Sequence, residues 1–127
     1  MKIYGVGADI IKIDRIKKSL KKNSFVKRLF NKNEILKCRK NKDSSNCFAK
    51  RFAAKEAFSK ALGTGISKGI SFNEIIVLNE KSGKPFIKVI DSTKKIVEKK
   101  FKGKKYKVSL SLSDEDNYAV AFVTISV

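Results

Sequence analysis

The chain of 127 residues contains no histidine and only two cysteines. Without histidine, a Ser-His-Asp or Cys-His catalytic couple, an imidazole general base and a histidine-based zinc site are all excluded. Cys38 and Cys47 are nine residues apart, which is typical of neither zinc nor redox motifs, so we expect reduced, partly buried thiols. An enzyme of this composition must use carboxylates, lysines, hydroxyls, backbone amides or a bound hard cation.

Acidic residues and long apolar runs are also scarce. Twelve Asp plus Glu stand against 30 Lys plus Arg, which gives a formal charge of +18. The longest apolar runs are too short to cross a membrane, and residues 1–13 lack the apolar core of a signal peptide. Apolar residues still make up 42% of the chain, too many for a disordered basic tail. We therefore expect one compact cytoplasmic domain over residues 1–127.

Hydrophobic periodicity predicts an α+β fold in which a mostly antiparallel sheet packs against a long buried helix. We expect helices at 14–22, about 25–30, from 33 onward, 47–62 and 92–101. We expect strands at 2–13, 74–78, 86–89, 107–113 and 118–127, the last two forming a hairpin through a turn at 114–117.

The predicted helix at 47–62 is apolar nearly all round, yet Glu56 and Lys60 lie on one of its faces. One interpretation is a plain i,i+4 ion pair, worth a few tenths of a kcal/mol on a solvated helix. The other is a ligand site, because charges among Phe and Ala are costly unless they are paired or bind something. Asp9, at the end of the first strand, is either a cap for the next turn or a metal ligand.

Several segments, taken in order, resemble the holo-acyl-carrier-protein synthases, the small trimeric phosphopantetheinyl transferases. Residues 5–10 read Gly-Val-Gly-Ala-Asp-Ile, and residues 51–60 read Arg-Phe-Ala-Ala-Lys-Glu-Ala-Phe-Ser-Lys. Residues 63–65, 81–85 and 111–114 continue the match, which covers nearly the whole chain. The resemblance implies the 4′-phosphopantetheinyl transferase fold.

The resemblance also implies an activity: transfer of the 4′-phosphopantetheine arm of coenzyme A to a serine of acyl carrier protein, releasing adenosine 3′,5′-bisphosphate. Asp9 and Glu56 occupy the family's metal-ligand positions and suit Mg²⁺, with Mn²⁺ as an alternative. Lys60 would neutralise the pyrophosphate as a third catalytic residue. The proton acceptor stays open between a metal-bound water, Glu56 and Glu34, although Glu34 is equally read as an exposed charge at a helix start.

Residues of several segments are implied in coenzyme A binding: Arg51, for the 3′-phosphate, with Lys60, Gly63, Gly65, Pro85 and Ser113. For Arg51 the alternative is a plain surface cation. The chain departs from the family pattern at Asp114, where many members have histidine. An aspartate cannot give phosphate a cationic hydrogen bond, so Asp114 would instead accept a hydrogen bond from adenine or water.

The basic surface has an implied partner, because acyl carrier proteins are strongly acidic and complementary charge speeds association. We expect the carrier to dock on Arg15, Lys18, Lys22 and Arg28. The resemblance further implies a homotrimer with its sites at subunit interfaces. The positive charge is alternatively explained by a small basic nucleic-acid-binding domain. Such a domain would carry aromatic residues on exposed strand faces, whereas most Phe residues here occupy core-like helical positions.

Overall fold

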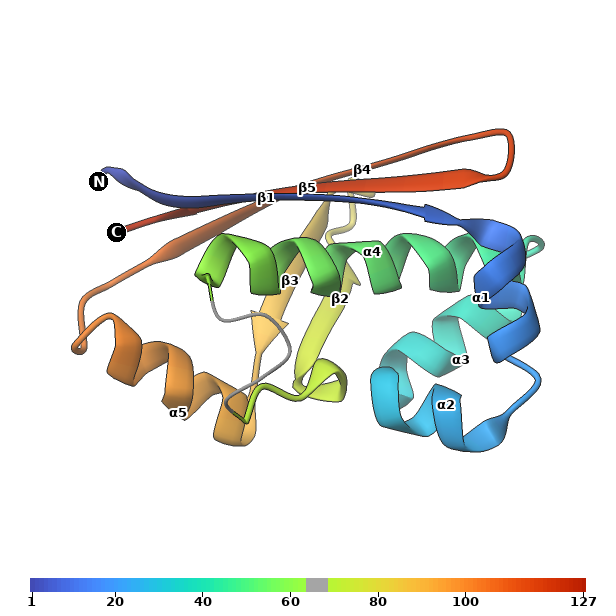
Figure 1. The fold of residues 1–127 in the computed structure, drawn as a ribbon, viewed down its shortest axis with the longest axis horizontal. Coiled ribbons are helices and arrows are strands. Elements are labelled where there is room, and N and C mark those ends of the chain that lie inside the picture. Colours follow the sequence, from blue (N-terminus) through green and yellow to red (C-terminus); the bar gives the residue numbers. More distant parts are fainter. Residues whose placement is uncertain (64–68) are drawn as a thin grey trace.

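The protein is built around one long helix, α4 (Ser44–Leu62), as seen in the computed structural model, which describes residues 1–63 and 69–127. A three-stranded sheet covers one side of α4 and a two-stranded hairpin lies on the other (Figure 1). The other elements, in chain order, are β1 (Ile3–Lys12), α1 (Ile13–Ser19), α2 (Asn23–Leu29), α3 (Lys32–Lys40), the 3₁₀ turn η1 (Phe72–Glu74), β2 (Ile75–Asn79), β3 (Pro85–Val89), α5 (Asp91–Lys100), β4 (Lys107–Glu115) and β5 (Tyr118–Ser126).

The larger sheet has the strand order β1-β5-β4, and every neighbouring pair is antiparallel. The two chain ends lie together (Figure 1), where Lys2 and Val127 exchange backbone hydrogen bonds of 2.9 and 2.8 Å. Strands β2 and β3 form a separate antiparallel hairpin. The predicted α+β class with mostly antiparallel pairing is confirmed.

Strand β1 lies unusually close to α4 because two of its inward positions are glycine. A Cβ atom added at Gly7 would lie 1.9 Å from the backbone oxygen of Ala57, and one at Gly5 would lie 1.9 Å from that of Ala61. Alternating residues of a strand share a face, so Asp9 points toward α4 as Gly5 and Gly7 do. Backbone-to-backbone packing of β1 on α4 therefore sets where Asp9 lies.

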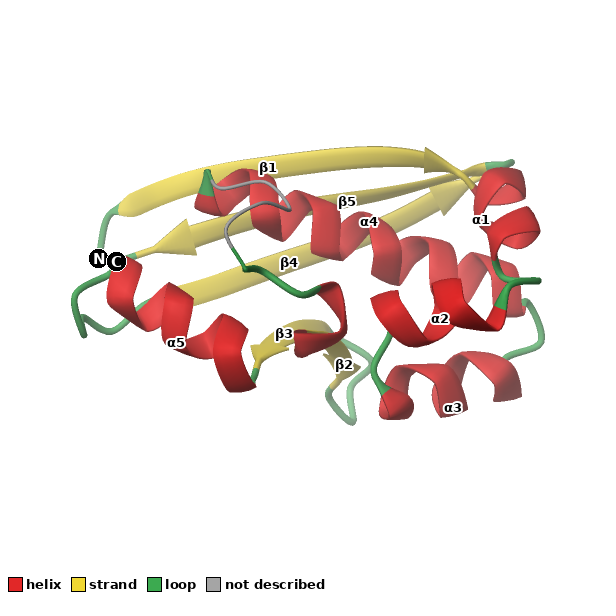
Figure 2. Ribbon diagram, turned by 60° about the horizontal axis from the view of Figure 1, so that its bottom comes forward, coloured by secondary structure: helices red, strands yellow, loops and turns green. Residues whose placement is uncertain are grey.

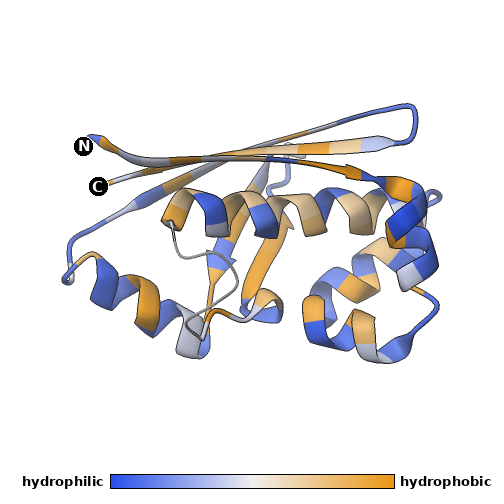
Figure 3. Ribbon diagram, viewed as in Figure 1, coloured by the Kyte–Doolittle hydropathy of each residue, from blue (hydrophilic) through white to orange (hydrophobic). Residues whose placement is uncertain are grey.

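Helix α4 is buried on nearly all sides, as its sequence predicts. One core cluster joins its second half to β2, α5 and β5, and a second joins its first half to α1, α2 and α3. Strand β2 is hydrophobic along most of its length (Figure 3) and is buried at Ile75, Ile76 and Val77. Gly63 ends α4 with a left-handed backbone, at φ 84°, which confirms the predicted helix stop.

The short helices α1, α2 and α3 gather at one end of α4, and α5 lies at the other (Figure 2). Helix α1 ends at Ser19, one turn before the predicted end at residue 22, so Lys22 precedes α2 instead. Helix α4 starts at Ser44, three residues earlier than predicted, because Asp43 caps it by accepting a hydrogen bond from Asn46 N at 3.1 Å. Strand β4 extends to Glu115, so the predicted turn at 114–117 is shorter.

The face of the larger sheet turned away from α4 carries exposed apolar side chains on β1 and β5 and exposed serines on β4. Val6, Ile10, Val120 and Phe122 lie on it, each between 37% and 65% exposed. Strand pairing places Ile10 opposite Val120 and Ala8 opposite Phe122, so these side chains form one continuous surface. Among residues 1–63 and 69–127, no helix is both long and apolar enough to cross a bilayer.

Candidate active site

Asp9, Glu56 and Lys60 come together in one pocket of about 510 Å³. Asp9 comes from the inward face of β1, whereas Glu56 and Lys60 come from successive turns of α4. Phe25, Phe52 and Arg15 are among the other residues that line this pocket. Two carboxylates and an ammonium group, predicted from distant parts of the sequence, thus share one site.

The ammonium group of Lys60 is held by β1 and not by its helical neighbour Glu56. Its Nζ donates hydrogen bonds to Asp9 Oδ1 at 3.1 Å and to the backbone oxygen of Ala8 at 3.0 Å. Lys60 is nevertheless 53% exposed, so its charge faces the pocket. The interpretation of Glu56 and Lys60 as a simple i,i+4 pair is therefore wrong.

Glu56 is half-buried beside another carboxylate. Burial raises the pKa of the Glu56 carboxyl above its usual value; the negative charge of Asp9 raises it further, and only the positive charge of Lys60 opposes the change. The carboxylate form of Glu56 is thus held at a free-energy cost, which a bound cation would relieve.

The donor set of this pocket fits a hard divalent cation. Mg²⁺ prefers oxygen ligands and is commonly held by one or two carboxylates together with substrate phosphates and water. Across the described part of the chain, no cluster of three His, Cys, Asp or Glu side chains forms a complete metal site. Asp9 and Glu56 would therefore hold the ion only together with oxygen ligands from water or substrate.

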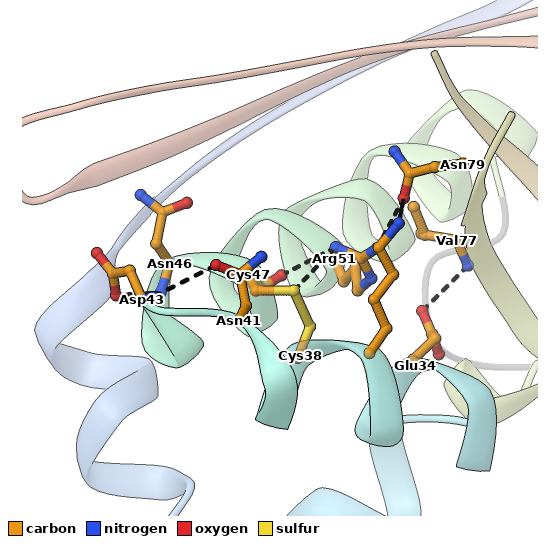
Figure 4. The surroundings of a disulfide bond; sticks show 10 residues. Glu34, Cys38, Asn41, Asp43, Asn46, Cys47, Arg51, Val77 and Asn79 are labelled. Carbon is orange, nitrogen blue, oxygen red and sulfur yellow. Dashed lines mark hydrogen bonds between the residues drawn. A yellow bond between two sulfur atoms is a disulfide. The ribbon is translucent and has the colours of Figure 1, made fainter. Parts of the chain in front are cut away.

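Arg51 lies in a different pocket, between α4 and the β2–β3 hairpin, and is only 5% exposed. Its Nη2 donates to Asn79 Oδ1 at 3.0 Å and its Nη1 to Cys47 Sγ at 3.2 Å, while its Nε is buried without a partner (Figure 4). Burial lowers the pKa of Arg51, and the negative charge of Glu34 opposes that change. The alternative interpretation of Arg51 as a surface cation is wrong.

Asp114 lies at the same pocket, where both its oxygens already accept hydrogen bonds. Asn46 Nδ2 donates to one at 2.8 Å and Lys50 Nζ to the other at 3.2 Å. The Asn46 hydrogen bond, followed by that of Lys50, lowers the pKa of Asp114. Asp114 is thus an anion tethered to Lys50.

The other residues predicted to bind coenzyme A are spread over the molecule. Gly63 lies at the end of α4 and Pro85 at the start of β3, while Gly65 falls outside the described residues. Ser113 is exposed beside Val120 on the sheet face turned away from α4. The described residues of one chain therefore do not bring Ser113 or Pro85 into the pocket of Asp9.

The predicted carrier-docking residues line two pockets that share Phe25, one of which is the pocket of Asp9, Glu56 and Lys60. Arg15 lines that pocket itself. Lys18, Lys22 and Arg28 line a second one, and Phe25 belongs to both. Although α1 ends earlier than predicted, these four basic residues still lie close together.

Glu34 is not an exposed charge, contrary to one interpretation of the sequence. Its side chain is fully buried, and its Oε1 accepts a hydrogen bond from Lys55 Nζ at 2.7 Å. Its two oxygens also accept from the backbone nitrogens of Asn31 and Val77. Fully engaged and sealed from solvent, Glu34 has no route to a substrate proton.

Lys55 completes this ion pair and was not predicted as a functional residue. Its Nζ also donates to the backbone oxygens of Phe72 and Ile75. Burial lowers its pKa to about 8, even though Glu34 favours the charged form. The signal in the sequence was its position on a helix predicted to be apolar all round, where any lysine needs a buried partner.

Cys38 and Cys47 are joined in a disulfide, so the expectation of reduced thiols is wrong for this structure. Cys38 is in the last turns of α3 and Cys47 in the first turn of α4. The packing of these two helices brings the cysteines together, and spacing in the sequence gave no sign of it.

Nearly the whole chain matches known proteins. The family model described as the 4′-phosphopantetheinyl transferase superfamily matches residues 5–123. The holo-[acyl-carrier-protein] synthase of Pelagibacter ubique is 50% identical over 125 residues, which cover 98% of each chain.

Solved structures agree in fold. The holo-[acyl-carrier-protein] synthase of Neisseria meningitidis matches with a TM-score of 0.88 and 38% identity, covering 98% of this chain and 99% of that one. That of Bacillus anthracis, in complex with coenzyme A (3′,5′-ADP), matches with a TM-score of 0.79 and 37% identity over 98% and 97% of the chains. The predicted family and fold are thereby confirmed. The chain belongs to the 4′-phosphopantetheinyl transferase superfamily and, within it, to the holo-[acyl-carrier-protein] synthases.

Proposed function

We propose that this protein transfers the 4′-phosphopantetheine group of coenzyme A to a serine of apo acyl carrier protein, in the cytoplasm and with Mg²⁺ or Mn²⁺. The observation that carries the proposal is the meeting of Asp9, Glu56 and Lys60 in one pocket. Asp9 and Glu56 would hold the cation, which supplies positive charge to the pyrophosphate of the substrate. The nucleic-acid alternative rests on the formal charge of +18 and does not account for the meeting of Asp9 and Glu56 in one pocket.

The side chains of the pocket divide the work of the reaction. Lys60, anchored on Asp9 and Ala8, presents its charge to the phosphate that departs with the nucleotide. Glu56, which lines the pocket from α4, would take the serine proton directly or through water. The attacking hydroxyl belongs to the carrier protein, so the enzyme needs neither a nucleophile of its own nor histidine.

The pocket around Arg51 is suited to the 3′-phosphate of coenzyme A. Arg51, Lys55 and Glu34 form a buried group with a net charge of +1, and the Nε of Arg51 has no partner. Lys37 and Lys50 line the same pocket. A planar guanidinium in the wall of a pocket that also carries two lysines suits the oxygens of a phosphate.

The basic patch and the bare sheet face suit two protein partners. Lys18, Lys22 and Arg28, beside the active-site pocket, would guide an acidic carrier protein to it. The exposed face of Ile10, Val120 and Phe122, and the residues around them, would be covered in a homotrimer. Because Ser113 lies on that face, a neighbouring subunit could receive it, which would explain its distance from Asp9 within one chain.

The test is mass spectrometry of apo acyl carrier protein incubated with coenzyme A, Mg²⁺ and this protein. We expect a gain of roughly 340 Da, abolished by a chelator or by Glu56→Gln because both remove the cation site. The control is Glu80→Gln, an exposed glutamate outside the pocket, which should leave the rate unchanged. If several acidic carriers gain no mass, the proposal is wrong.

A further inference from the structure

The Cys38–Cys47 disulfide lies beside the pocket assigned to the coenzyme's 3′-phosphate. The bond ties α3 to α4 across residues 39–46 (Figure 4). Cys38 is fully buried, whereas Cys47 is 4% exposed and lines the same pocket as Arg51. Cys47 is therefore the half of the disulfide that borders that pocket.

Arg51 is in direct contact with the bond. Its Nη1 donates hydrogen bonds to Cys47 Sγ at 3.2 Å and to the Cys47 backbone oxygen at 3.4 Å. Lys37 and Lys50 add positive charge to the pocket, and Asp43 and Asp114 add negative charge. Asp114 is already neutralised by Lys50, and Asp43 caps α4, so cations prevail next to the sulfur.

We propose that Cys38 and Cys47 form a reversible redox site, open to dithiol reductants, whose oxidation state sets the affinity for the 3′-phosphate of coenzyme A. The inference rests on the coenzyme site assigned above. In the reducing compartment proposed for this protein, disulfides are characteristically transient or redox-sensing.

Reduction follows thiol–disulfide exchange, with two electrons passing from the dithiol to the protein. A thiolate of the reductant attacks Cys47 Sγ, the sulfur–sulfur bond breaks, and Cys38 leaves as a thiolate that takes up a proton. The reductant's second thiolate then attacks the reductant sulfur that is bonded to Cys47. This forms a disulfide within the reductant. Cys47 is released as a thiolate next to Arg51.

The released thiolate changes the charge that a phosphate meets. A disulfide sulfur is neutral and a weak acceptor, so in the oxidised protein the full charge of Arg51 is available to the phosphate. Neighbouring cations stabilise a thiolate, and a Cys47 thiolate would pair with Arg51 and compete with the phosphate. The oxidised protein should thus bind the 3′-phosphate more tightly than the reduced one.

The experiment is calorimetric titration with adenosine 3′,5′-bisphosphate, which carries the 3′-phosphate and no thiol. We expect reduction by dithiothreitol to raise its dissociation constant about fivefold or more. Adenosine 5′-diphosphate, without a 3′-phosphate, should bind equally in both states. Cys38→Ala, which keeps the Cys47 thiol, should bind like the reduced protein, and C38A/C47A should bind like the oxidised one whether or not dithiothreitol is present.

Two results would overturn the inference. One is full alkylation of both cysteines by iodoacetamide in protein first incubated with a disulfide oxidant, which would show that the disulfide does not form. The other is equal affinity for adenosine 3′,5′-bisphosphate in the two states. Neither readout requires turnover, so a failure of phosphopantetheine transfer, seen in the carrier assay, stays distinct from a failure of this redox site.

Discussion

Gly7→Ala should damage both stability and catalysis, because it separates the two elements that carry the active site. The new Cβ would lie 1.9 Å from the backbone oxygen of Ala57 and 2.9 Å from its carbonyl carbon. Both partners are backbone atoms, so no rotamer change relieves the clash. To restore an ordinary contact distance, β1 must move away from α4 by about 1.5 Å.

That shift acts on Asp9, two residues further along the same strand face. A misplacement of about 1 Å can cost about 10²-fold in rate, so we expect kcat/KM for carrier modification to fall at least that far. Overpacking of this kind typically costs about 1–3 kcal/mol, and the rigid backbone here favours the upper end. Carrier mass spectrometry measures the first effect and urea unfolding the second.

Gly103→Ala is the matched control. Gly103 has a positive φ of 76°, but no heavy atom lies within 4 Å of an added Cβ. The free energy of unfolding of the Gly103→Ala variant should therefore fall by about 1–2 kcal/mol because of backbone strain, while its activity stays unchanged. A Gly7→Ala protein that is destabilised yet fully active would refute the role of this contact in placing Asp9, and one unchanged in both respects would refute the contact itself.

Four other experiments test the buried ion pair, the candidate cation site, the carrier-docking patch and the exposed sheet face around Phe122. Lys55→Met leaves Glu34 buried without its cation and should lower the free energy of unfolding by about 3–5 kcal/mol, whereas a loss under about 1 kcal/mol would contradict the burial of the pair. Because burial and Asp9 raise the pKa of Glu56, calorimetry should show Mg²⁺ affinity falling as pH drops through that raised value, and Lys60→Gln should move the fall to higher pH. Arg15→Glu should raise KM for the carrier and leave KM for coenzyme A unchanged, and an equal effect on both would argue against docking there. In analytical ultracentrifugation, Phe122→Glu should convert a trimer into monomers, whereas the control Lys88→Glu, at an exposed position of β3, should not. A wild-type protein that sediments as a monomer at all salt concentrations would count against the trimer.

Much of the fold and of the candidate site was predictable because it depends on local pattern. Alternation marks β4 and β5, and a helix that is apolar all round must be buried, as α4 is. The family motif located Asp9, Glu56 and Lys60, and the structure adds that Lys60 pairs with Asp9 across the β1–α4 contact. A helical pattern alone shows neighbours four residues apart, so it suggested the wrong partner for Lys60.

Contacts between distant segments were not predictable. Glu34 begins a short helix full of lysines and looks like an ordinary exposed capping residue. It does form a capping box with Asn31, but the same carboxylate also reaches Lys55 and the edge of β2. The disulfide has the same origin, because only the packing of α3 on α4 brings Cys38 to Cys47.

Lys55 and Glu56 show how burial separates a structural charge from a functional one. They are adjacent on α4, so their side chains point about 100° apart. Lys55 is sealed against Glu34 and two backbone oxygens, and every polar contact it needs comes from the protein. Glu56 is half-buried next to a second carboxylate, and only Lys60 opposes the accumulated negative charge. A charge that the fold has already paired has nothing left to bind, whereas a charge held at a cost and open to a pocket gains free energy from a ligand of opposite sign. By this criterion Glu56, and not Lys55, is the member of this adjacent pair expected to bind a cation, while the buried Lys55–Glu34 pair holds the helix that presents Glu56.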